Sequence, residues 1–484
     1  MQHLANENIP KMRSELIDQF TAIVGDRYAL VASNDIEPFV TDTRGRYTAT
    51  SPLVLRPGSV DEVAAILKLA SETGTPVIPQ GGNTGLVGGG LPLNDGESTE
   101  VMLSLGRLNK IIDVDPDSNT MTVEAGVILE NIQNAADEVG RLFPLSLGAQ
   151  GTCQIGGNIG TNAGGTGVLA YGNTRDLVMG LEAVLPSGEI WNGLTRLRKD
   201  NTGYDLKNLF VGAEGTLGVV TKAVLKLFPK PRGREVAYVA LQSPEAALSL
   251  LNQAKNQAGN TLTAFEFMAG IAMEFTLKHA QSDIRRPIEG EHPWYVLMEI
   301  SSPRSAQDAR DILEAVLGEA FENGTINDAV LADSLEHQRQ FWTLREDMSW
   351  AQKPEGASIK HDISVPVGSI PDFIKVADKA VLDIVPDARI VNFGHMGDGN
   401  LHYNISQPVG WEAEAFFAHE PAVHEAVYKK VGEFNGSISA EHGIGQMKRD
   451  KLAAIKDPTA LAMMRTIKQA LDPKGIMNPG KVIG

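Results

Sequence analysis

The stretch Val391–Ser406, VNFGHMGDGNLHYNIS, predicts two strands joined by a tight turn. The Gly-Asp-Gly-Asn run is typical of a turn, and polar-apolar alternation resumes on both sides of it. His395 ends the first strand and His402 begins the second, so a hairpin would place both imidazoles side by side. Two converging imidazoles supply half of a first-row metal site. A glycine turn flanked by two hydrogen-bonded histidines is the alternative interpretation of the same pattern.

A third metal ligand must come from elsewhere in the chain. The best candidate downstream is Glu441, in SAEHGIG, and His442 follows it directly. Two histidines and a carboxylate with an open position suit zinc or manganese. We therefore predict that His395, His402 and Glu441 form a divalent metal site and that the metal is zinc or manganese.

Two glycine-rich blocks precede this region. The first, PQGGNTGLVGGG (79–90), follows a predicted strand, and its glycines allow successive backbone N–H groups to point at one anion. The second, GAQGTCQIGGNIGTNAGGTG (148–167), has too few bulky side chains to form a core of its own. A large ligand is therefore expected to lie against it.

Composition excludes several classes of protein. The 484 residues predict two or three domains, and 42% hydrophobic with 21% charged residues is ordinary for a globular chain. The net charge of −17 argues against nucleic-acid binding and against a polybasic membrane anchor. No apolar run is long enough for a transmembrane helix. The single cysteine, Cys153, excludes an intramolecular disulfide and a cysteine-ligated iron–sulfur cluster within this chain, and a cytoplasmic protein is expected.

The domain boundary is expected at Pro229–Gly233, PKPRG, beyond which glycine becomes less frequent. A polar helix over Gln338–Lys353 and a strand over Ile359–Val365 are predicted further on, the strand carrying Lys360 and Asp362 on one face. Two nucleotide-binding patterns are rejected. GTGVLA (165–170) lacks the strand and helix that give a dinucleotide fingerprint its meaning, and GIMNPGKV (475–482) has Val after its lysine and no following helix.

Six motifs in one order resemble a known family: PQGGNTGLVGG, GGNIGTNAGG, GAEGTLG, GHMGDGNLH, AEHGIG and the terminal NPGK. Over residues 35–484 the chain resembles FAD-dependent 2-hydroxyacid dehydrogenases of the vanillyl-alcohol-oxidase/p-cresol-methylhydroxylase class. Its greatest likeness is to D-2-hydroxyglutarate dehydrogenases, with D-lactate dehydrogenases and glycolate oxidase flavin subunits as relatives.

The resemblance implies an α+β fold in three parts. A two-part flavin-binding domain of the p-cresol-methylhydroxylase type would span residues 1–231. A smaller α/β substrate or cap domain with an antiparallel sheet would span 232–450 and hold the metal site. The C-terminal segment, 451–484, would return to the flavin domain.

The resemblance also assigns the flavin-binding residues. The first glycine loop would hold the pyrophosphate, with Pro79, Gly81, Gly82, Asn83, Thr84 and Gly85. The flavin path would be lined by Pro144, Gly151, Thr152, Gly156, Gly157, Asn158, Thr161, Ala163 and Gly165. Near the adenine or the ring system we expect Gly215 and Val220, and Asn478 is expected to approach the isoalloxazine. Members with covalent flavin often carry a histidine where this chain has Asn83, so non-covalent FAD is expected.

The implied reaction is oxidation of a D-2-hydroxyacid to the 2-oxoacid, with hydride transfer to FAD and His442 as the base. Arg345 would bind the carboxylate next to the reacting carbon, while Ser349 and Lys360 would hold a distal carboxylate and Asn404 a further oxygen. The family often has threonine in place of Ser349. A dicarboxylate such as D-2-hydroxyglutarate or D-malate is therefore expected, unless Asp362 neutralises Lys360.

Several alternatives stay open at this point. A D-lactate or glycolate type of dehydrogenase or oxidase differs only in substrate or acceptor. A metal-dependent hydrolase or lyase without flavin leaves both glycine blocks unexplained, and a flavin-binding subunit without activity leaves the metal ligands unexplained. Electrons are expected to leave to a separate acceptor, either an electron-transfer flavoprotein or a quinone. The motifs do not decide the oligomeric state, for which a homodimer is one option.

Overall fold

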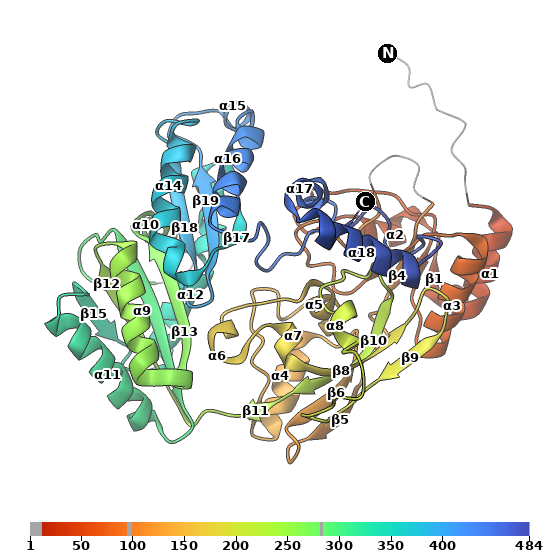
Figure 1. Cartoon of the computed structure of the whole chain (residues 1–484), viewed down its shortest axis with the longest axis horizontal. Coiled ribbons are helices and arrows are strands. Elements are labelled where there is room, and N and C mark those ends of the chain that lie inside the picture. Colours follow the sequence, from red (N-terminus) through yellow and green to blue (C-terminus); the bar gives the residue numbers. More distant parts are fainter. Residues whose placement is uncertain (1–11, 94–98, 281–283, 484) are drawn as a thin grey trace.

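The computed structural model describes residues 12–93, 99–280 and 284–483, which form two lobes (Figure 1). The first lobe contains the N-terminal half of the chain together with the C-terminal helices. The second lobe contains the middle of the chain. The chain passes between them from β11 (Phe228–Pro229) to β12 (Gly233–Leu241), within the PKPRG segment predicted as the boundary.

The first lobe begins with a four-stranded sheet of order β1-β2-β4-β3, in which β2, β4 and β3 run parallel. Its strands are β1 (Ala29–Leu30), β2 (Val54–Leu55), β3 (Val77–Gln80) and β4 (Val101–Ser104). The accompanying helices are α1 (Ser14–Val24), α2 (Ser33–Val40) and α3 (Val60–Thr73). Helix α3 begins where the Ser59 hydroxyl accepts a hydrogen bond from the Glu62 N–H, and its buried residues, Val63, Ile66, Leu67 and Ala70, fall at helical spacing.

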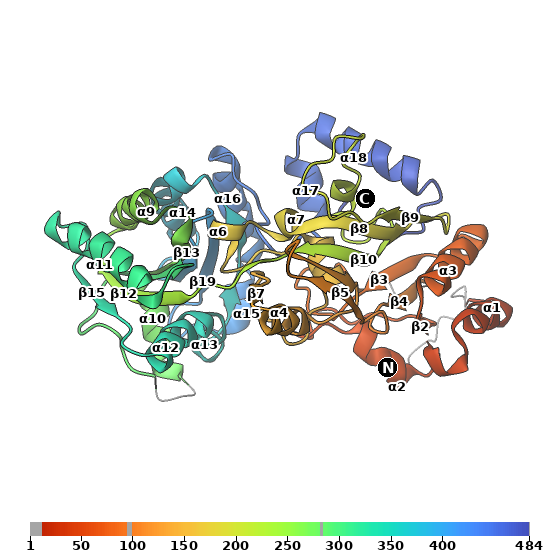
Figure 2. The same cartoon turned by 90° about the horizontal axis from the view of Figure 1, so that it is seen from below.

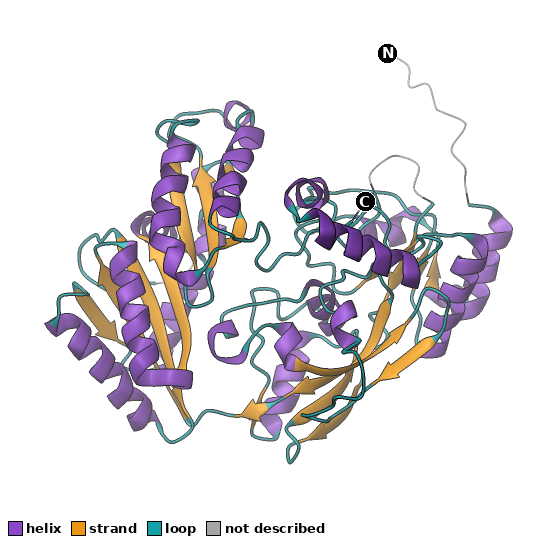
Figure 3. Ribbon diagram, in the orientation of Figure 1, coloured by secondary structure: helices purple, strands orange, loops and turns teal. Residues whose placement is uncertain are grey.

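A five-stranded antiparallel sheet of order β5-β6-β10-β8-β9 completes this lobe (Figure 3). Its strands are β5 (Ile111–Asp115), β6 (Thr120–Glu124), β8 (Val178–Val184), β9 (Ile190–Gly193) and β10 (Val219–Lys226). A short pairing joins β11 to β7 (Arg141–Leu142). Helices between these strands are α4 (Leu129–Glu138), α5 (Ile155–Thr161), α6 (Val168–Tyr171), α7 (Thr174–Leu177) and α8 (Lys207–Phe210).

The second lobe is built on a mainly antiparallel sheet of order β15-β12-β14-β13-β18-β19-β16, with β17 also paired to β19. Besides β12, its strands are β13 (Leu262–Ala269), β14 (Trp294–Ser302), β15 (Asp328–Leu331), β16 (Ser358–Ile359), β17 (Asp362–Ser364), β18 (Arg389–His395) and β19 (Asn400–Ser406). The predicted hairpin is therefore β18–β19, and it lies inside this sheet.

Helices cover both faces of that sheet (Figure 2). One face is packed by α9 (Pro244–Ala258), α11 (Ala306–Glu322), α14 (Ile370–Leu382) and α16 (Glu420–Glu433), with short α15 (Ala413–Phe417) before the last of these. The other face is packed by α10 (Gly270–His279), α12 (Leu335–Glu346) and α13 (Met348–Ala351). Each face has its own buried apolar cluster, so alternate residues of the central strands belong to different cores.

The C-terminal segment lies on the first lobe (Figure 1). It contains α17 (Arg449–Ile455) and α18 (Pro458–Leu471). The N–H of Val77 in β3 donates to the Ile476 carbonyl, and the N–H of Asn478 donates back to the Val77 carbonyl. The side chains of Ile476 and Met477 are buried in the core of the four-stranded sheet. The three residue ranges expected from the sequence stay predictions, although the path of the chain agrees with their order.

Two predicted elements differ from the structure. The helix expected over Gln338–Lys353 is divided at Asp347 into α12 and α13. The strand expected over Ile359–Val365 is interrupted at Lys360 and His361, where β16 ends before β17 begins. Lys360 and Asp362 therefore do not share the face of one continuous strand. Among the described residues, no helix is both long enough and apolar enough to cross a bilayer.

Candidate active site

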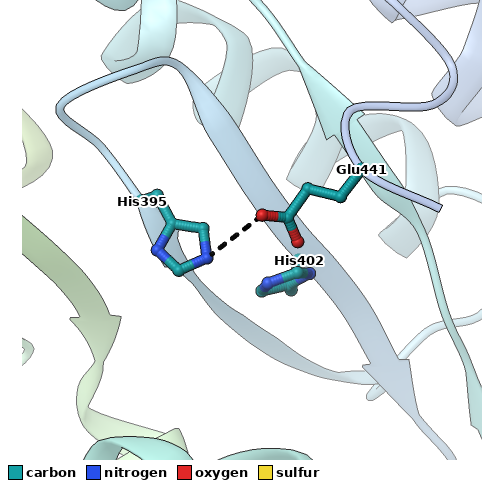
Figure 4. A group of neighbouring side chains, drawn as sticks. All are labelled: His395, His402 and Glu441. Carbon is teal, nitrogen blue, oxygen red and sulfur yellow. Dashed lines mark ion pairs between the residues drawn. The ribbon is translucent and has the colours of Figure 1, made fainter. Parts of the chain in front are cut away.

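The β18–β19 hairpin brings His395 and His402 together, as its sequence predicts (Figure 4). Their ring centroids lie 5.6 Å apart. Glu441 approaches from a loop that follows α16, and its Oε1 lies 3.6 Å from His395 Nε2. One ligand atom from each of His395, His402 and Glu441 lies within 4.8 Å of the others. Two imidazoles and a carboxylate at this spacing suit a divalent first-row metal.

A buried carboxylate on the neighbouring strand β13 orients His395. Glu266 is paired directly with His395 in the sheet register, and its Oε1 accepts the His395 Nδ1–H at 2.7 Å. This bond fixes the tautomer that leaves Nε2 free to face Glu441. Metal-binding histidines almost always have such a hydrogen-bonded partner on the other ring nitrogen. The arrangement therefore fits a metal site better than it fits two histidines that only stabilise a turn.

The loop that carries Glu441 and His442 is held from the second lobe by Asp362. The Oδ2 of Asp362 accepts hydrogen bonds from the N–H of Glu441 at 3.0 Å and of His442 at 2.9 Å. The same oxygen lies 3.4 Å from His442 Nδ1. The other oxygen accepts a bond from Asn400 at 3.0 Å. Asp362 therefore fixes both the backbone of this loop and the orientation of the His442 ring.

The same loop is held from the first lobe by Glu214, which belongs to the GAEGTLG motif. Its two carboxylate oxygens accept hydrogen bonds from the N–H of Ile444 at 2.7 Å and of Gly445 at 2.8 Å. The Glu214 carbonyl also accepts a bond from the Asn478 amide at 2.7 Å. The loop thus lies between a carboxylate of each lobe, and its position relative to both is determined.

A cavity of about 640 Å³ lies in the first lobe against this loop. Both glycine blocks line it, and Glu441 and His442 lie at its edge. A Cβ placed on Gly164 would lie 3.0 Å from Glu441 Oε1, so the second glycine block reaches the predicted metal cluster. The size is within the usual range for a cofactor pocket.

The walls of the cavity are suited to a large polar ligand. A Cβ built on Gly85, Gly148 or Gly157 would meet no other atom within 4 Å and would project into open space. At Gly82, in contrast, a Cβ would collide with the Thr152 carbonyl, so the two glycine blocks can approach only because this residue has no side chain. Two buried polar atoms of this wall, Gln154 Oε1 and Asn158 Oδ1, have no hydrogen-bond partner in the described part of the chain. The residues present therefore fit a bound flavin nucleotide.

Most of the residues predicted to bind the cofactor line this cavity. The exceptions are Pro144, Gly151, Gly165 and Asn478. Gly165 has a structural function, because at φ 154° a Cβ would collide with the Ser146 carbonyl. Asn478 is buried behind the wall, where its amide donates to the carbonyls of Gly89 and Glu214. For these four residues the structure shows no direct place on the cavity wall.

The predicted substrate residues lie on the same sheet face as the two histidines. The Arg345 guanidinium carbon lies 5.0 Å from the Phe393 ring centroid, and its Nη2 lies 2.7 Å from Glu266 Oε2. Asn404 is buried on β19, two residues after His402 and therefore on the same side of the strand.

Lys360 and Ser349 are neighbours, because the Lys360 ammonium donates to the Ser349 carbonyl at 3.3 Å. The possibility that Asp362 neutralises Lys360 is not supported, since Asp362 bonds to the loop that carries Glu441 and His442 and to Asn400. Burial, together with the positive charges of Arg44 and Lys353, lowers the pKa of Lys360 to about 8. A cation in such surroundings gains when an anion binds beside it.

The pKa values of the three histidines at this site are set by burial and by their charged neighbours. Burial disfavours the charged form of His395, but the Glu266 carboxylate outweighs this effect and raises the pKa of His395 to about 9. Burial and the neighbouring His395 lower the pKa of His402, which is therefore neutral. Burial likewise lowers the pKa of His442, against the opposing effect of Asp362. A neutral imidazole is the form needed by a metal ligand and by a general base, so His402 and His442 are already in that form, whereas His395 would release its Nε2 proton on binding a metal.

Comparison with known proteins agrees with the fold and the cavity. Residues 51–193 match the family model described as an FAD binding domain, and residues 230–482 match the one described as FAD linked oxidases, C-terminal domain. The structure of p-cresol methylhydroxylase with substrate bound aligns with a TM-score of 0.75 at 18% identity, over 98% of each chain. Fold and cavity thus define a flavin-dependent oxidoreductase. The chain belongs to the FAD-linked oxidase family, as its six motifs predict.

Two curated relatives cover nearly the whole chain. A mitochondrial D-2-hydroxyglutarate dehydrogenase of Arabidopsis thaliana is 39% identical over 478 residues, which is 99% of this chain and 83% of that protein. A provisionally named mitochondrial D-lactate dehydrogenase of Schizosaccharomyces pombe is 37% identical over 490 residues, covering 98% and 91%. The two-domain flavin-binding fold predicted from the sequence is confirmed, as are the enzyme class and FAD.

The prediction of a cytoplasmic protein is contradicted by these relatives, whose names place them in mitochondria. The prediction relied on the single cysteine, Cys153. Cysteine usage indicates the redox surroundings of a chain, and it does not specify a compartment inside the cell.

Three carboxylates of the site were not assigned from the sequence. Glu266 gives a signal, since it is the one charged residue in the apolar strand LTAFEFMA, and a buried charge needs a partner. Glu214 lies in a motif from which only Gly215 was assigned. Asp362 was considered only as a competitor for Lys360. Each acts through residues far along the chain, and such pairings cannot be derived from spacing.

Flavin binding can be tested by filling the open space at Gly157. In Gly157→Leu the new Cβ has no protein atom within 4 Å and the side chain would extend into the cavity, so we expect a folded protein with flavin affinity lower by about tenfold or more. The ratio of flavin to protein absorbance after purification measures this effect. Gly318→Leu is the control, because Gly318 is exposed on α11 and also has open space. Equal flavin content in both variants would place the flavin elsewhere.

Proposed function

We propose that the chain oxidises a D-2-hydroxy dicarboxylate, such as D-2-hydroxyglutarate or D-malate, to the 2-oxoacid. The observation that carries the proposal is the position of Glu441 and His442, which line the flavin cavity while Glu441 also reaches the two histidines. The names of the relatives, D-2-hydroxyglutarate dehydrogenase and D-lactate dehydrogenase, support a 2-hydroxyacid substrate.

In this proposal His395, His402 and Glu441 hold a divalent metal, with zinc and manganese the first candidates. Such an ion, when bound, would lower the pKa of the substrate hydroxyl and orient it. Glu266 orients the His395 ring so that Nε2 faces the site, where it would release its proton on binding the metal, whereas the neutral His402 needs no deprotonation. Glu441 is kept in reach by Asp362 through the backbone of its loop.

His442 acts as the base that takes the proton from the substrate hydroxyl oxygen. Burial lowers its pKa, so its imidazole is neutral and able to accept a proton near neutral pH. Asp362, with Oδ2 3.4 Å from Nδ1, orients the ring and stabilises the imidazolium that forms. FAD, when bound in the cavity, supplies the hydride acceptor.

In this proposal the substrate carboxylates are bound by residues on the sheet face that carries His395 and His402. Arg345 binds the carboxylate beside the reacting carbon, and its buried Nε has no hydrogen-bond partner within the described residues. Lys360 and Ser349 hold the distal carboxylate, and Asn404 contributes a further polar contact. The positive charges of Arg44 and Lys353 near Lys360 favour a second anionic group over an apolar tail.

FAD is held non-covalently in this proposal, and electrons leave to a separate acceptor, an electron-transfer flavoprotein or a quinone. Asn83 occupies the position where a linking histidine is expected in covalent members. Its amide instead donates to the carbonyls of Pro38 at 3.1 Å and Thr41 at 2.8 Å, which secures the first glycine loop.

Removing the proposed metal should stop catalysis without removing the flavin. Removing divalent ions with a chelator should abolish turnover with an artificial acceptor while the visible flavin spectrum is retained, and zinc or manganese should restore activity.

His402→Ala should lose bound metal in elemental analysis. This variant is preferable to His395→Ala, which would leave the Glu266 charge buried with one partner fewer. His292→Ala is the control, because it removes a histidine of the same lobe whose Nε2 hydrogen-bonds to the Glu289 carbonyl and whose ring contacts Tyr295, away from the candidate site. Full activity of a metal-free preparation would contradict the proposal.

Substrate selectivity should depend on Lys360. In Lys360→Ala, kcat/KM for D-2-hydroxyglutarate should fall by about ten- to a hundredfold, since a charge-assisted hydrogen bond contributes roughly 1.5–3 kcal/mol. The value for D-lactate, which has no distal carboxylate, should hardly change. Lys353→Ala, which removes an exposed neighbouring cation, should have a smaller effect.

The same selectivity should depend on pH. The pKa of Lys360 is lowered to about 8, so the side chain is a cation below that pH and loses its charge above it. The ratio of kcat/KM for D-2-hydroxyglutarate to that for D-lactate should therefore fall as pH rises through this range. Lys360→Ala should show a flat ratio. A wild-type preference for D-lactate, or equal losses for both substrates, would show that Lys360 does not bind a distal carboxylate.

A further inference from the structure

Glu266 is a carboxylate in the middle of a buried apolar strand. It lies on β13 with 1% of its surface exposed, among residues that otherwise form the two apolar cores. A buried charge of this kind is costly unless it is paired and hydrogen-bonded. Its contacts therefore indicate what the chain gains by placing it there.

Each oxygen of Glu266 has a cationic partner from a different element. Oε1 lies 2.7 Å from His395 Nδ1 on β18, and Oε2 lies 2.7 Å from Arg345 Nη2 on α12. These two are its ion-pair partners among the described residues. The backbone position of Glu266 is itself fixed, because it is the direct sheet partner of His395. One carboxylate thus joins a proposed metal ligand to the proposed clamp for the substrate carboxylate.

Both partners present their remaining polar atoms to the site. With Nδ1–H bonded to Glu266, the His395 Nε2 faces Glu441 at 3.6 Å. Arg345 is 6% exposed and lies over the Phe393 ring, and neither its Nε nor its Nη2 has a hydrogen-bond partner in the described structure, so Nη2 meets Glu266 as an ion pair. The buried Arg345 donors, and His395 Nε2 once a metal displaces its proton, are therefore in position to receive ligands.

We infer that Glu266 is a positioning residue that orients the metal site and the substrate clamp together, an inference that rests on the proposed function. Because the same carboxylate holds His395 and Arg345, its loss should weaken metal binding and substrate binding at once. A residue that only stabilised the fold would lower stability and leave both affinities of the folded protein unchanged.

The test compares Glu266→Gln with wild type in two binding measurements that do not require turnover. Metal affinity is measured by competition of zinc or manganese with a chelator. Affinity for the product 2-oxoglutarate is measured from the change it causes in the absorbance of the oxidised flavin. We expect metal binding to weaken by about 10- to 100-fold, as for other residues that orient metal ligands. Binding of 2-oxoglutarate should weaken by a similar factor.

Glu299→Gln is the matched control. Glu299 is another buried carboxylate of the same sheet, on β14, but its partners lie outside the site: Trp342 Nε1 at 3.0 Å, Thr263 at 2.9 Å, Ser301 at 3.3 Å and Arg234 at 3.7 Å. It should leave both affinities unchanged. If Glu266→Gln does not fold, Glu266→Asp keeps the charge on a shorter side chain that cannot reach both partners, and both affinities should again fall. Wild-type values in the folded variant, or loss of only one affinity, would overturn the inference. A wild-type enzyme that binds no metal would instead overturn the proposed function.

Discussion

The geometry of the candidate active site depends on one loop, residues 441–445, which is hydrogen-bonded to a carboxylate from each lobe. Asp362 accepts the N–H groups of Glu441 and His442, and Glu214 accepts those of Ile444 and Gly445. Bonds from backbone N–H groups to an ionised carboxylate are stronger than neutral ones. Glu441 and His442 are adjacent in the sequence and both line the cavity edge, while Glu441 also reaches the two histidines of the hairpin. The loop can present both side chains to the site because its backbone is irregular and held on both sides.

The flavin cavity and the proposed metal site are formed by opposite means. The cavity exists because side chains are missing from two glycine blocks, so that a large cofactor can lie against backbone N–H groups. The proposed metal site consists of polar side chains gathered beside a buried antiparallel sheet, where the Glu266 carboxylate pairs with His395. Electrostatic groups in a dry site act more strongly than in water and need no reorganisation during the reaction. The two lobes therefore contribute different parts of one active centre.

The sequence predicts the parts of this centre that are local in the chain. The Gly-Asp-Gly-Asn turn fixes the hairpin that pairs His395 with His402, and the two glycine blocks indicate the cavity. The interruption of the strand at Lys360, and the bonds made by Asp362, could not be predicted, because they depend on the approach of a loop about 80 residues away. Glu266 and His395 are 129 positions apart, and Glu214 and Ile444 are 230 apart. Pairings between residues so far apart are set by tertiary packing, and the spacing of residue types along the sequence does not reveal them.

The most direct test is the rate at which D-2-hydroxyglutarate reduces the flavin without oxygen, measured by rapid mixing of wild type and His442→Asn. Both proteins should contain the same flavin and metal, since His442 is a ligand to neither in this account. Loss of a positioned base should slow flavin reduction by about 10²–10⁴-fold in the variant. Equal rates of flavin bleaching in the two proteins would show that His442 does not take the proton. No bleaching of the wild-type flavin by any D-2-hydroxyacid would contradict the proposed reaction itself.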